Sequence, residues 1–154
     1  DFARRVEALL TASGMEPSLL ELELTESMVM SRSRLVLETL EGLRDIGVRL
    51  SLDDFGTGFS SLGYLRSFPI HRLKIDQSFV REAHLNPVNA SIIRAIVALA
   101  RSLSIEVVAE GVEVDEELAL VRDSGCDESQ GFLHAKPMSG DAFVAWRKAI
   151  NARR

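Results

Sequence analysis

The chain has 154 residues, of which 46% are hydrophobic, 27% are charged and 6% are aromatic. This composition supports a buried core and excludes a disordered tail or a long coiled coil. A formal net charge of -5, with the arginines scattered along the chain, argues against a nucleic-acid polymer as the partner. The longest apolar run, 95–100, is far shorter than the roughly 20 residues of a membrane span, so we expect no span.

Cysteine usage and the first residues bear on the cellular compartment. The single cysteine, Cys126, cannot form a disulfide within the chain. The start Asp-Phe-Ala-Arg-Arg lacks the apolar stretch of a signal peptide, so we expect a cytoplasmic protein. The start also lacks an initiator methionine. We therefore expect residues 1–154 to be a single domain cut from a longer chain.

Short strand-like runs alternate with helical runs, and no linker or low-complexity tract interrupts them. The expected elements are, in chain order, a helix over 2–11, a strand over 20–24, a helix over 31–46, a strand over 48–52, a glycine-rich loop over 54–58, a short helix near 60–66, a strand over 72–75, a helix over 87–103, a strand over 105–109, a helix over 115–124, a strand over 130–133 and a helix over 139–151. Such alternation predicts right-handed βαβ units and a parallel α/β sheet. Because eight βα units need about 250 residues, the chain is either an open sheet or the later part of a (β/α) barrel.

Polar side chains stand at the carboxyl end of each expected strand, where active sites of both architectures lie. Side chains alternate between the two faces of a strand, and the apolar residues of each run occupy the opposite face. Parallel pairing brings the strand ends to one rim of the sheet. The side chains expected at this rim are, in order, Glu23, Asp53, Lys74 with Asp76, Glu110 and Gln130.

Several carboxylates at one rim cannot all remain ionised without a counter-charge, and one lysine is not enough. Divalent cations would supply that charge, and the oxygen ligands of Asp and Glu favour Mg²⁺ or Mn²⁺ over Zn²⁺. The three histidines show no metal-ligand spacing. The alternative is that these carboxylates form ordinary ion pairs with arginines at the strand ends.

The run Asp53-Asp54-Phe-Gly-Thr-Gly contains two adjacent carboxylates. Strand alternation would point Asp54 away from Asp53, so both can face one site only if the strand ends at Asp53 and the backbone turns. The two glycines permit such a turn, although Gly-x-Gly alone is a weak signal. In Ala-Glu110-Gly-Val-Glu113 a strand likewise ends in an acid and a glycine, and Glu113 fits a ligand or a first-turn acid of the next helix equally well.

Five motifs follow one another along the chain. They are Glu23-Leu-Thr-Glu26-Ser, Asp53-Asp54-Phe-Gly-Thr-Gly-Phe-Ser-Ser-Leu, Leu-Lys74-Ile-Asp76-Gln-Ser-Phe-Val, Val-Ala-Glu110-Gly-Val-Glu113 and Gly-Cys-Asp-Glu-Ser-Gln130-Gly-Phe-Leu-His-Ala-Lys-Pro. Together they resemble the EAL-domain cyclic-di-GMP phosphodiesterases, over essentially the whole chain. The resemblance covers only the later two-thirds of the family's domain and implies a TIM-like (β/α) barrel, here a partial barrel lacking the first strands. The Glu-Ala-Leu signature of the family's first strand is not in this sequence.

The resemblance also implies roles for individual residues. The implied ligands of two Mg²⁺ or Mn²⁺ ions are Glu23, Asp53, Asp54 and Glu110, with Asp53 bridging the ions. The implied catalytic residues are Lys74, which would stand near the attacking water and the phosphate, Asp76 and Glu110. The residues implied for substrate binding or for anchoring the loop after Asp54 are Glu26, Gln130 and Glu113.

The implied reaction is hydrolysis of one phosphodiester of cyclic di-GMP to linear pGpG in bacterial second-messenger signalling. A catalytically inactive receptor for cyclic di-GMP and a plain α/β interaction module are the alternatives. The enzyme is favoured because the Asp-Asp-Phe-Gly-Thr-Gly run and the metal carboxylates are all present. We expect the complete domain to be active, the isolated 154 residues to hydrolyse little, and the family's pairing helices near the glycine-rich loop to support a homodimer.

Overall fold

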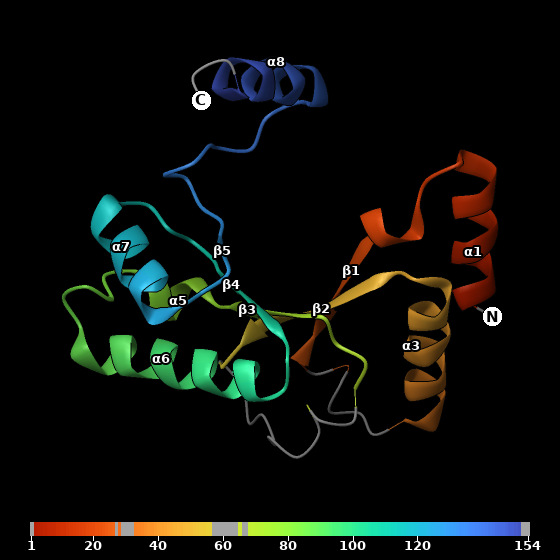
Figure 1. Cartoon of the computed structure of the whole chain (residues 1–154), viewed down its shortest axis with the longest axis horizontal. Coiled ribbons are helices and arrows are strands. Elements are labelled where there is room, and N and C mark those ends of the chain that lie inside the picture. Colours follow the sequence, from red (N-terminus) through yellow and green to blue (C-terminus); the bar gives the residue numbers. More distant parts are fainter. Residues whose placement is uncertain (1, 27, 29–32, 57–64, 66–67, 152–154) are drawn as a thin grey trace.

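The computed structural model describes residues 2–26, 28, 33–56, 65 and 68–151 (Figure 1). The strands are β1 (Glu21–Thr25), β2 (Arg49–Phe55), β3 (Arg72–Ile75), β4 (Glu106–Ala109) and β5 (Glu128–Ser129). The helices are α1 (Phe2–Ser13), the 3-10 turn η1 (Pro17–Leu19), α3 (Arg34–Ile46), α5 (Gln77–Val80), α6 (Pro87–Ser102), α7 (Asp115–Ser124) and α8 (Gly140–Asn151). Among the described residues, no helix has both the length and the apolar character that crossing a membrane requires.

The five strands form one parallel sheet whose spatial order is the order of the sequence. A doubly wound sheet reverses its strand order at a switch point, whereas the strands of a (β/α) barrel follow one another around the axis. The described strands contain no such reversal. The architecture is therefore α/β and corresponds to part of a (β/α) barrel, which decides between the two alternatives.

One expected element differs from the structure. The strand expected over 130–133 is wrong, because β5 ends before it and residues 131–133 turn around Val112. The Val112 carbonyl accepts a hydrogen bond from Leu133 N at 3.1 Å, and a Cβ on Gly131 would lie 2.1 Å from that same oxygen. The apolar pair Phe132-Leu133 suggested a strand, but only glycine allows this close approach. The short helix expected near 60–66 lies outside the described residues, except for Leu65.

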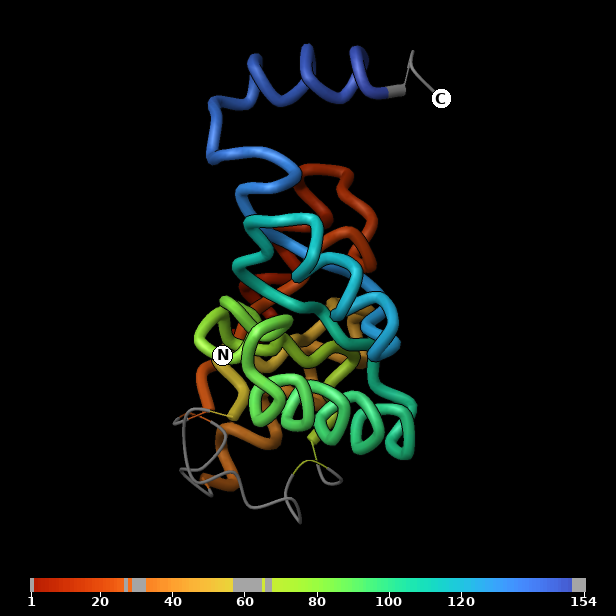
Figure 2. The backbone as a smooth tube through the Cα atoms, turned by 90° about the vertical axis from the view of Figure 1, so that its left-hand side faces the viewer, coloured from red at the N-terminus to blue at the C-terminus, as the bar shows by residue number. Residues whose placement is uncertain are grey.

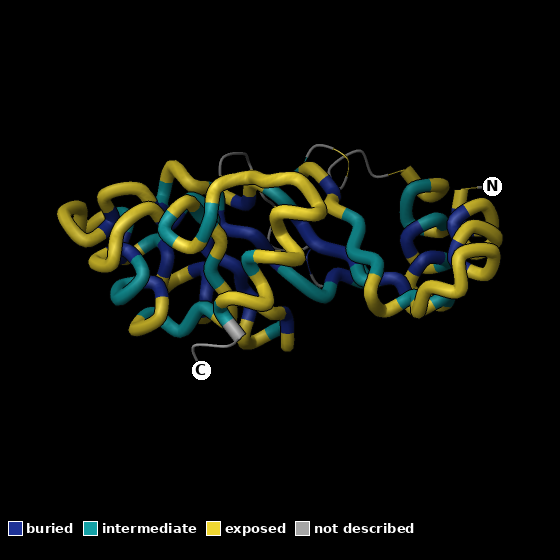
Figure 3. Tube along the Cα trace, turned by 90° about the horizontal axis from the view of Figure 1, so that it is seen from above, coloured by how far each residue is buried: buried dark blue, intermediate teal, exposed yellow. Residues whose placement is uncertain are grey.

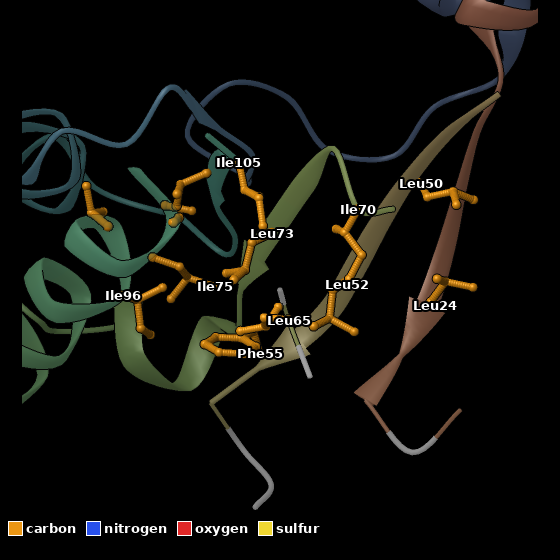
Figure 4. Close-up of a cluster of buried hydrophobic side chains, with 14 of the residues drawn as sticks. Leu24, Leu50, Leu52, Phe55, Leu65, Ile70, Leu73, Ile75, Ile96 and Ile105 are labelled. Atoms are coloured by element: carbon orange, nitrogen blue, oxygen red, sulfur yellow. The ribbon is translucent and has the colours of Figure 1, made fainter. Parts of the chain in front are cut away.

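Alternation along the strands divides the sheet into an apolar face and a polar face. The apolar side chains pack against the helices and form the core, as Figure 4 shows for β1, β2 and β3. Fully burying one such side chain contributes roughly 1.5–3 kcal/mol. Buried positions recur along the strands and on the inner turns of the helices (Figure 3). The strand residues in this core include Leu24, Leu50, Leu52, Leu73, Ile75 and Val107.

The polar face begins with an ion-pair network at the amino ends of the strands. Arg72 lies 3.1 Å from Glu21, 3.1 Å from Glu106 and 2.8 Å from Glu128, measured from guanidinium nitrogen to carboxylate oxygen. Arg49 also pairs with Glu21 and Glu106. These carboxylates at the amino ends of the strands form ordinary ion pairs with arginines. At the carboxyl ends of the same strands, by contrast, three carboxylates surround one lysine.

Helix ends set the angles at which the chain enters the sheet. Helix α3 ends at Gly47, whose φ of +97° lies in the left-handed region and lets the chain turn at once into β2. Helix α6 is preceded by its N-cap, Asn86, whose side chain accepts hydrogen bonds from Val88 N and Asn89 N. Helix α8 stands apart from the other helices in two perpendicular views (Figures 1 and 2). Its Phe143 and Trp146 rings contact each other, with centroids 5.8 Å apart.

Candidate active site and metal centre

Lys74 lies at the centre of the polar face, on β3, and its side chain is only 8% exposed. Its Nζ is 2.7 Å from Glu23 Oε1, 2.9 Å from Asp53 Oδ1 and 2.8 Å from Glu110 Oε1. The three carboxylates come from or directly follow β1, β2 and β4, so the sheet brings them together as the sequence predicts. One buried cation faces three anions, and the cluster retains a net negative charge.

Asp54 lies beside this cluster because of a backbone irregularity that the sequence did not predict. Strand β2 continues to Phe55 instead of ending at Asp53. The register between β2 and β3 shifts between Leu52 and Phe55, and Asp54 has a φ of +53°, in the left-handed region. This irregularity removes the alternation that would point Asp54 away. Asp53, Asp54 and Glu110 each offer a carboxylate oxygen, and the three oxygens lie within 4.8 Å of one another.

The electrostatics of the cluster favour a bound cation. Burial raises the pKa of Glu110, and the charges of Asp53 and Glu23 raise it further against the opposing effect of Lys74. The pKa of Asp54 is raised by burial and by the charges of Asp53 and Asp76. In both groups the anionic form is disfavoured first by burial and then by the neighbouring carboxylates. A donor set made only of carboxylate oxygens fits hard divalent ions such as Mg²⁺ or Mn²⁺.

Lys74 itself stays protonated. Burial alone would lower its pKa, but the interactions with Glu110, Glu23 and Asp53 outweigh burial and raise the pKa above its usual value. A permanently charged ammonium therefore stands beside the carboxylates. It can attract and orient a phosphate oxygen or a water molecule.

Asp76 follows β3 and caps the short helix α5. Its Oδ1 accepts hydrogen bonds from the Ser78 amide at 2.9 Å and from the Ser78 hydroxyl. Although burial raises the pKa of Asp76, these bonds outweigh it and hold the pKa below its usual value. Helix α5 was missed in the sequence, although an Asp two residues before a Ser is an N-cap signal.

A cavity of about 360 Å³ extends from the cluster. Glu113 and Gln130 are both exposed and both line it, so these two predicted residues share one space with Asp54 and Glu110. Glu26 follows β1 directly, is half-buried and is not among the lining residues. The lining residues are Asp54, Asp76, Gln77, Arg81, Glu110, Gly111, Glu113, Gln130, Gly131 and Phe132.

Glu117, on α7, is a site-supporting residue that motif reasoning missed. It is 3% exposed, and its carboxylate accepts hydrogen bonds from Glu82 N and Glu113 N, both at 2.8 Å, and from Val114 N at 3.3 Å. These bonds join the segment after α5 to the segment after β4. A Glu three residues into a helix is a capping-box position, and this spacing was the available signal.

Glu117→Gln is expected to lower the free energy of unfolding by roughly 1–3 kcal/mol at pH 7, because the amide keeps only one of the two acceptor oxygens and turns an NH₂ donor toward backbone N–H groups. Although burial raises the pKa of Glu117, the backbone hydrogen bonds outweigh it and lower the pKa in the folded state. Its stabilisation is therefore present above the unfolded pKa of about 4.3 and is lost as pH falls through the folded pKa. Urea unfolding at pH 7, 5 and 3.5 measures this. The exposed neighbour Glu116→Gln is the control, and an equal effect of both substitutions would contradict the assignment.

Comparison with known proteins places the chain in a family. The sequence model described as "EAL domain" matches residues 1–137. "Cyclic di-GMP phosphodiesterase PdeR" of Escherichia coli is 47% identical over 129 residues, which are 84% of this chain and 20% of that protein. The chain spans about a fifth of the length of the curated relatives it matches first.

Solved structures give the same result. The EAL domain of Mycobacterium smegmatis DcpA has a TM-score of 0.89 and 39% identity, covering 96% of this chain and 66% of that one. A manganese and cyclic-di-GMP complex of Klebsiella pneumoniae BlrP1 has a TM-score of 0.80 and 35% identity, covering 86% of this chain and 34% of that one. The match over most of the sequence and the agreement of the fold show that this chain belongs to the EAL domain family.

Proposed function

We propose that the protein carrying this chain hydrolyses cyclic di-GMP to linear pGpG with two Mg²⁺ or Mn²⁺ ions. The observation that carries the proposal is the group of carboxylate oxygens from Asp53, Asp54 and Glu110, within 4.8 Å of one another and beside buried Lys74. The names of PdeR and of the BlrP1 complex support the substrate and the kind of ion. We also propose that residues 1–154 form part of one EAL domain.

The proposed ligands are Glu23, Asp53, Asp54 and Glu110. When bound, the ions would supply charge for activating water and for stabilising the leaving 3′ oxygen. Lys74 orients the water and the phosphate, because its ammonium is held charged among the carboxylates. Asp76 holds the start of α5 beside the cavity.

Glu113 and Gln130 are proposed to contact the substrate from the cavity wall, and Glu26 to anchor the chain that follows Asp54. We further propose a cytoplasmic location and a homodimer.

Divalent-cation titration tests the metal site without relying on turnover. Mn²⁺ or Mg²⁺ at a hundred times its dissociation constant is expected to add about 2.7 kcal/mol to the free energy of unfolding. Asp54→Asn removes one ligand charge and should weaken this gain, while Asp45→Asn on the outer side of α3 should not. Thermal unfolding with and without each ion measures the effect. Equal cation stabilisation of all three proteins would contradict the site.

Hydrolysis and binding separate the proposed enzyme from a receptor. Product analysis of cyclic di-GMP incubated with the complete domain and Mn²⁺ is expected to show pGpG. Saturable binding of the dinucleotide with no product under these conditions would instead identify an inactive receptor.

A further inference from the structure

Among the described residues, Arg81 is the only cationic side chain that lines the 360 Å³ cavity beside Asp54 and Glu110. It follows α5 directly, and its Nη2 lies 2.9 Å from Glu113 Oε1. The side chains of Arg81 and Glu113 are 62% and 40% exposed, so both can meet a ligand in the cavity. Arg81 belongs to none of the metal, catalytic or substrate residues assigned above.

Two features hold this pair in place. Asp76 caps α5, the four-residue helix that Arg81 follows, and so ties Arg81 to the strand that carries Lys74. Buried Glu117 accepts hydrogen bonds from Glu82 N, next to Arg81, and from the amide of Glu113 itself. The backbones that carry the two side chains are therefore fixed relative to each other, although the side chains are exposed.

The pair presents a donor and an acceptor side by side. A guanidinium carries five N–H donors in a planar fork, and the bond from Nη2 to Glu113 leaves others available. The Glu113 carboxylate has a further acceptor oxygen. Guanine offers the complementary pattern: O6 and N7 accept hydrogen bonds, while N1–H and the 2-amino group donate them. Adenine has an amino donor where guanine has O6, so its pattern opposes that of the pair.

We propose that Arg81 and Glu113 form a guanine-recognition pair at the mouth of the cavity. Arg81 donates to the O6 and N7 side of one base, and Glu113 accepts from its N1–H and 2-amino group. The proposal deepens the proposed function and rests on it, because it selects among dinucleotides that share the same phosphate backbone. It makes Arg81 a specificity residue.

The competing explanation is that Arg81–Glu113 is an exposed ion pair of little consequence, as many surface pairs are. Binding of three dinucleotides in the presence of Ca²⁺, measured by calorimetry, distinguishes the two. The ligands are cyclic di-GMP, cyclic di-IMP, which lacks the 2-amino groups, and cyclic di-AMP. The variants are Arg81→Ala, Arg81→Lys and Glu113→Gln. Arg34→Ala, which breaks the exposed Arg34–Glu38 pair on α3, is the matched control.

Arg81→Ala is expected to weaken cyclic di-GMP binding by roughly ten- to a hundredfold and to leave cyclic di-AMP binding nearly unchanged. Arg81→Lys should recover little, because lysine keeps the charge but loses the fork. Glu113→Gln should reduce the preference for cyclic di-GMP over cyclic di-IMP. Thermal unfolding should be unchanged by Arg81→Ala.

Three results would overturn the inference. They are unchanged cyclic di-GMP affinity in Arg81→Ala, equal weakening of all three ligands with full recovery in Arg81→Lys, or an effect no larger than that of Arg34→Ala. The second result would mean that Arg81 senses phosphate charge instead of the base. If the unsubstituted protein binds none of the dinucleotides, the proposed function fails, and this inference fails with it.

Discussion

In the complete domain, Glu110→Gln should abolish hydrolysis of cyclic di-GMP and leave the fold intact. Glu110 belongs both to the carboxylate group that fits a metal and to the ion pairs of Lys74, so the amide removes one carboxylate charge from the proposed metal site. Loss of a supporting partner of a metal ligand alone costs about 10- to 100-fold, and loss of a ligand should cost more. Product formation per folded molecule, with folding checked by circular dichroism, measures this.

Glu106→Gln provides the matched control. Glu106 lies on β4, four residues before Glu110 in the sequence, but it pairs with Arg49 and Arg72 at the amino end of the sheet. Although burial raises its pKa, those arginines outweigh burial and hold the pKa of Glu106 low, so the substitution should cost some stability without changing turnover. Full activity of Glu110→Gln, or equal inactivation by both substitutions, would remove Glu110 from the site.

Lys74→Met should have the largest effect on stability. Removing the buried ammonium leaves Glu23, Asp53 and Glu110 facing one another, and breaking a buried ion pair in this way costs about 3–5 kcal/mol. The loss should shrink when Mn²⁺ is added, because a divalent ion can replace the missing charge. Chemical unfolding of the variant and the unsubstituted protein, with and without Mn²⁺, measures both effects.

The pH dependence of Lys74→Met has a definite sign. The folded pKa of Lys74 is raised, so its stabilisation is complete below the unfolded pKa of about 10.4 and is lost only as pH rises through the folded value. Titration of Lys74 therefore does not change the free energy of unfolding between pH 5 and 8. Without Lys74 the already raised pKa of Glu110 should rise further, so the variant should regain stability as pH falls from 7 to 5. A loss independent of both pH and Mn²⁺ would contradict this explanation.

Alternation and spacing were sufficient to predict the sheet, its parallel pairing and the meeting of Glu23, Asp53, Lys74 and Glu110. These predictions depend on period-2 patterns that repeat on every strand. The choice of a barrel over an open sheet needed the strand order, which spacing does not contain. The resemblance supplied that choice, and the sheet topology agrees with it.

The remaining features depend on local contacts that a pattern cannot express. The left-handed backbone at Asp54 accompanies the register shift between β2 and β3, and β3 is distant from Asp54 in the sequence. The buried carboxylate of Glu117 looks like one of three consecutive acids in Asp115-Glu-Glu117 until packing separates it from its neighbours. The strand expected over 130–133 failed because Gly131 approaches a backbone that the sequence alone does not place.

The register shift around Asp54 means that the proposed metal ligands Asp53 and Asp54 are positioned correctly only when β2 and β3 pair correctly. A slip of β2 by one residue against β3 would exchange inward and outward side chains and separate the oxygens of Asp53 and Asp54. The irregular register therefore has to form together with the apolar contacts of Leu52 and Leu73. Affinity for divalent ions should therefore depend on core packing, so that a conservative change such as Leu73→Val would weaken binding at the proposed metal site without altering any proposed ligand.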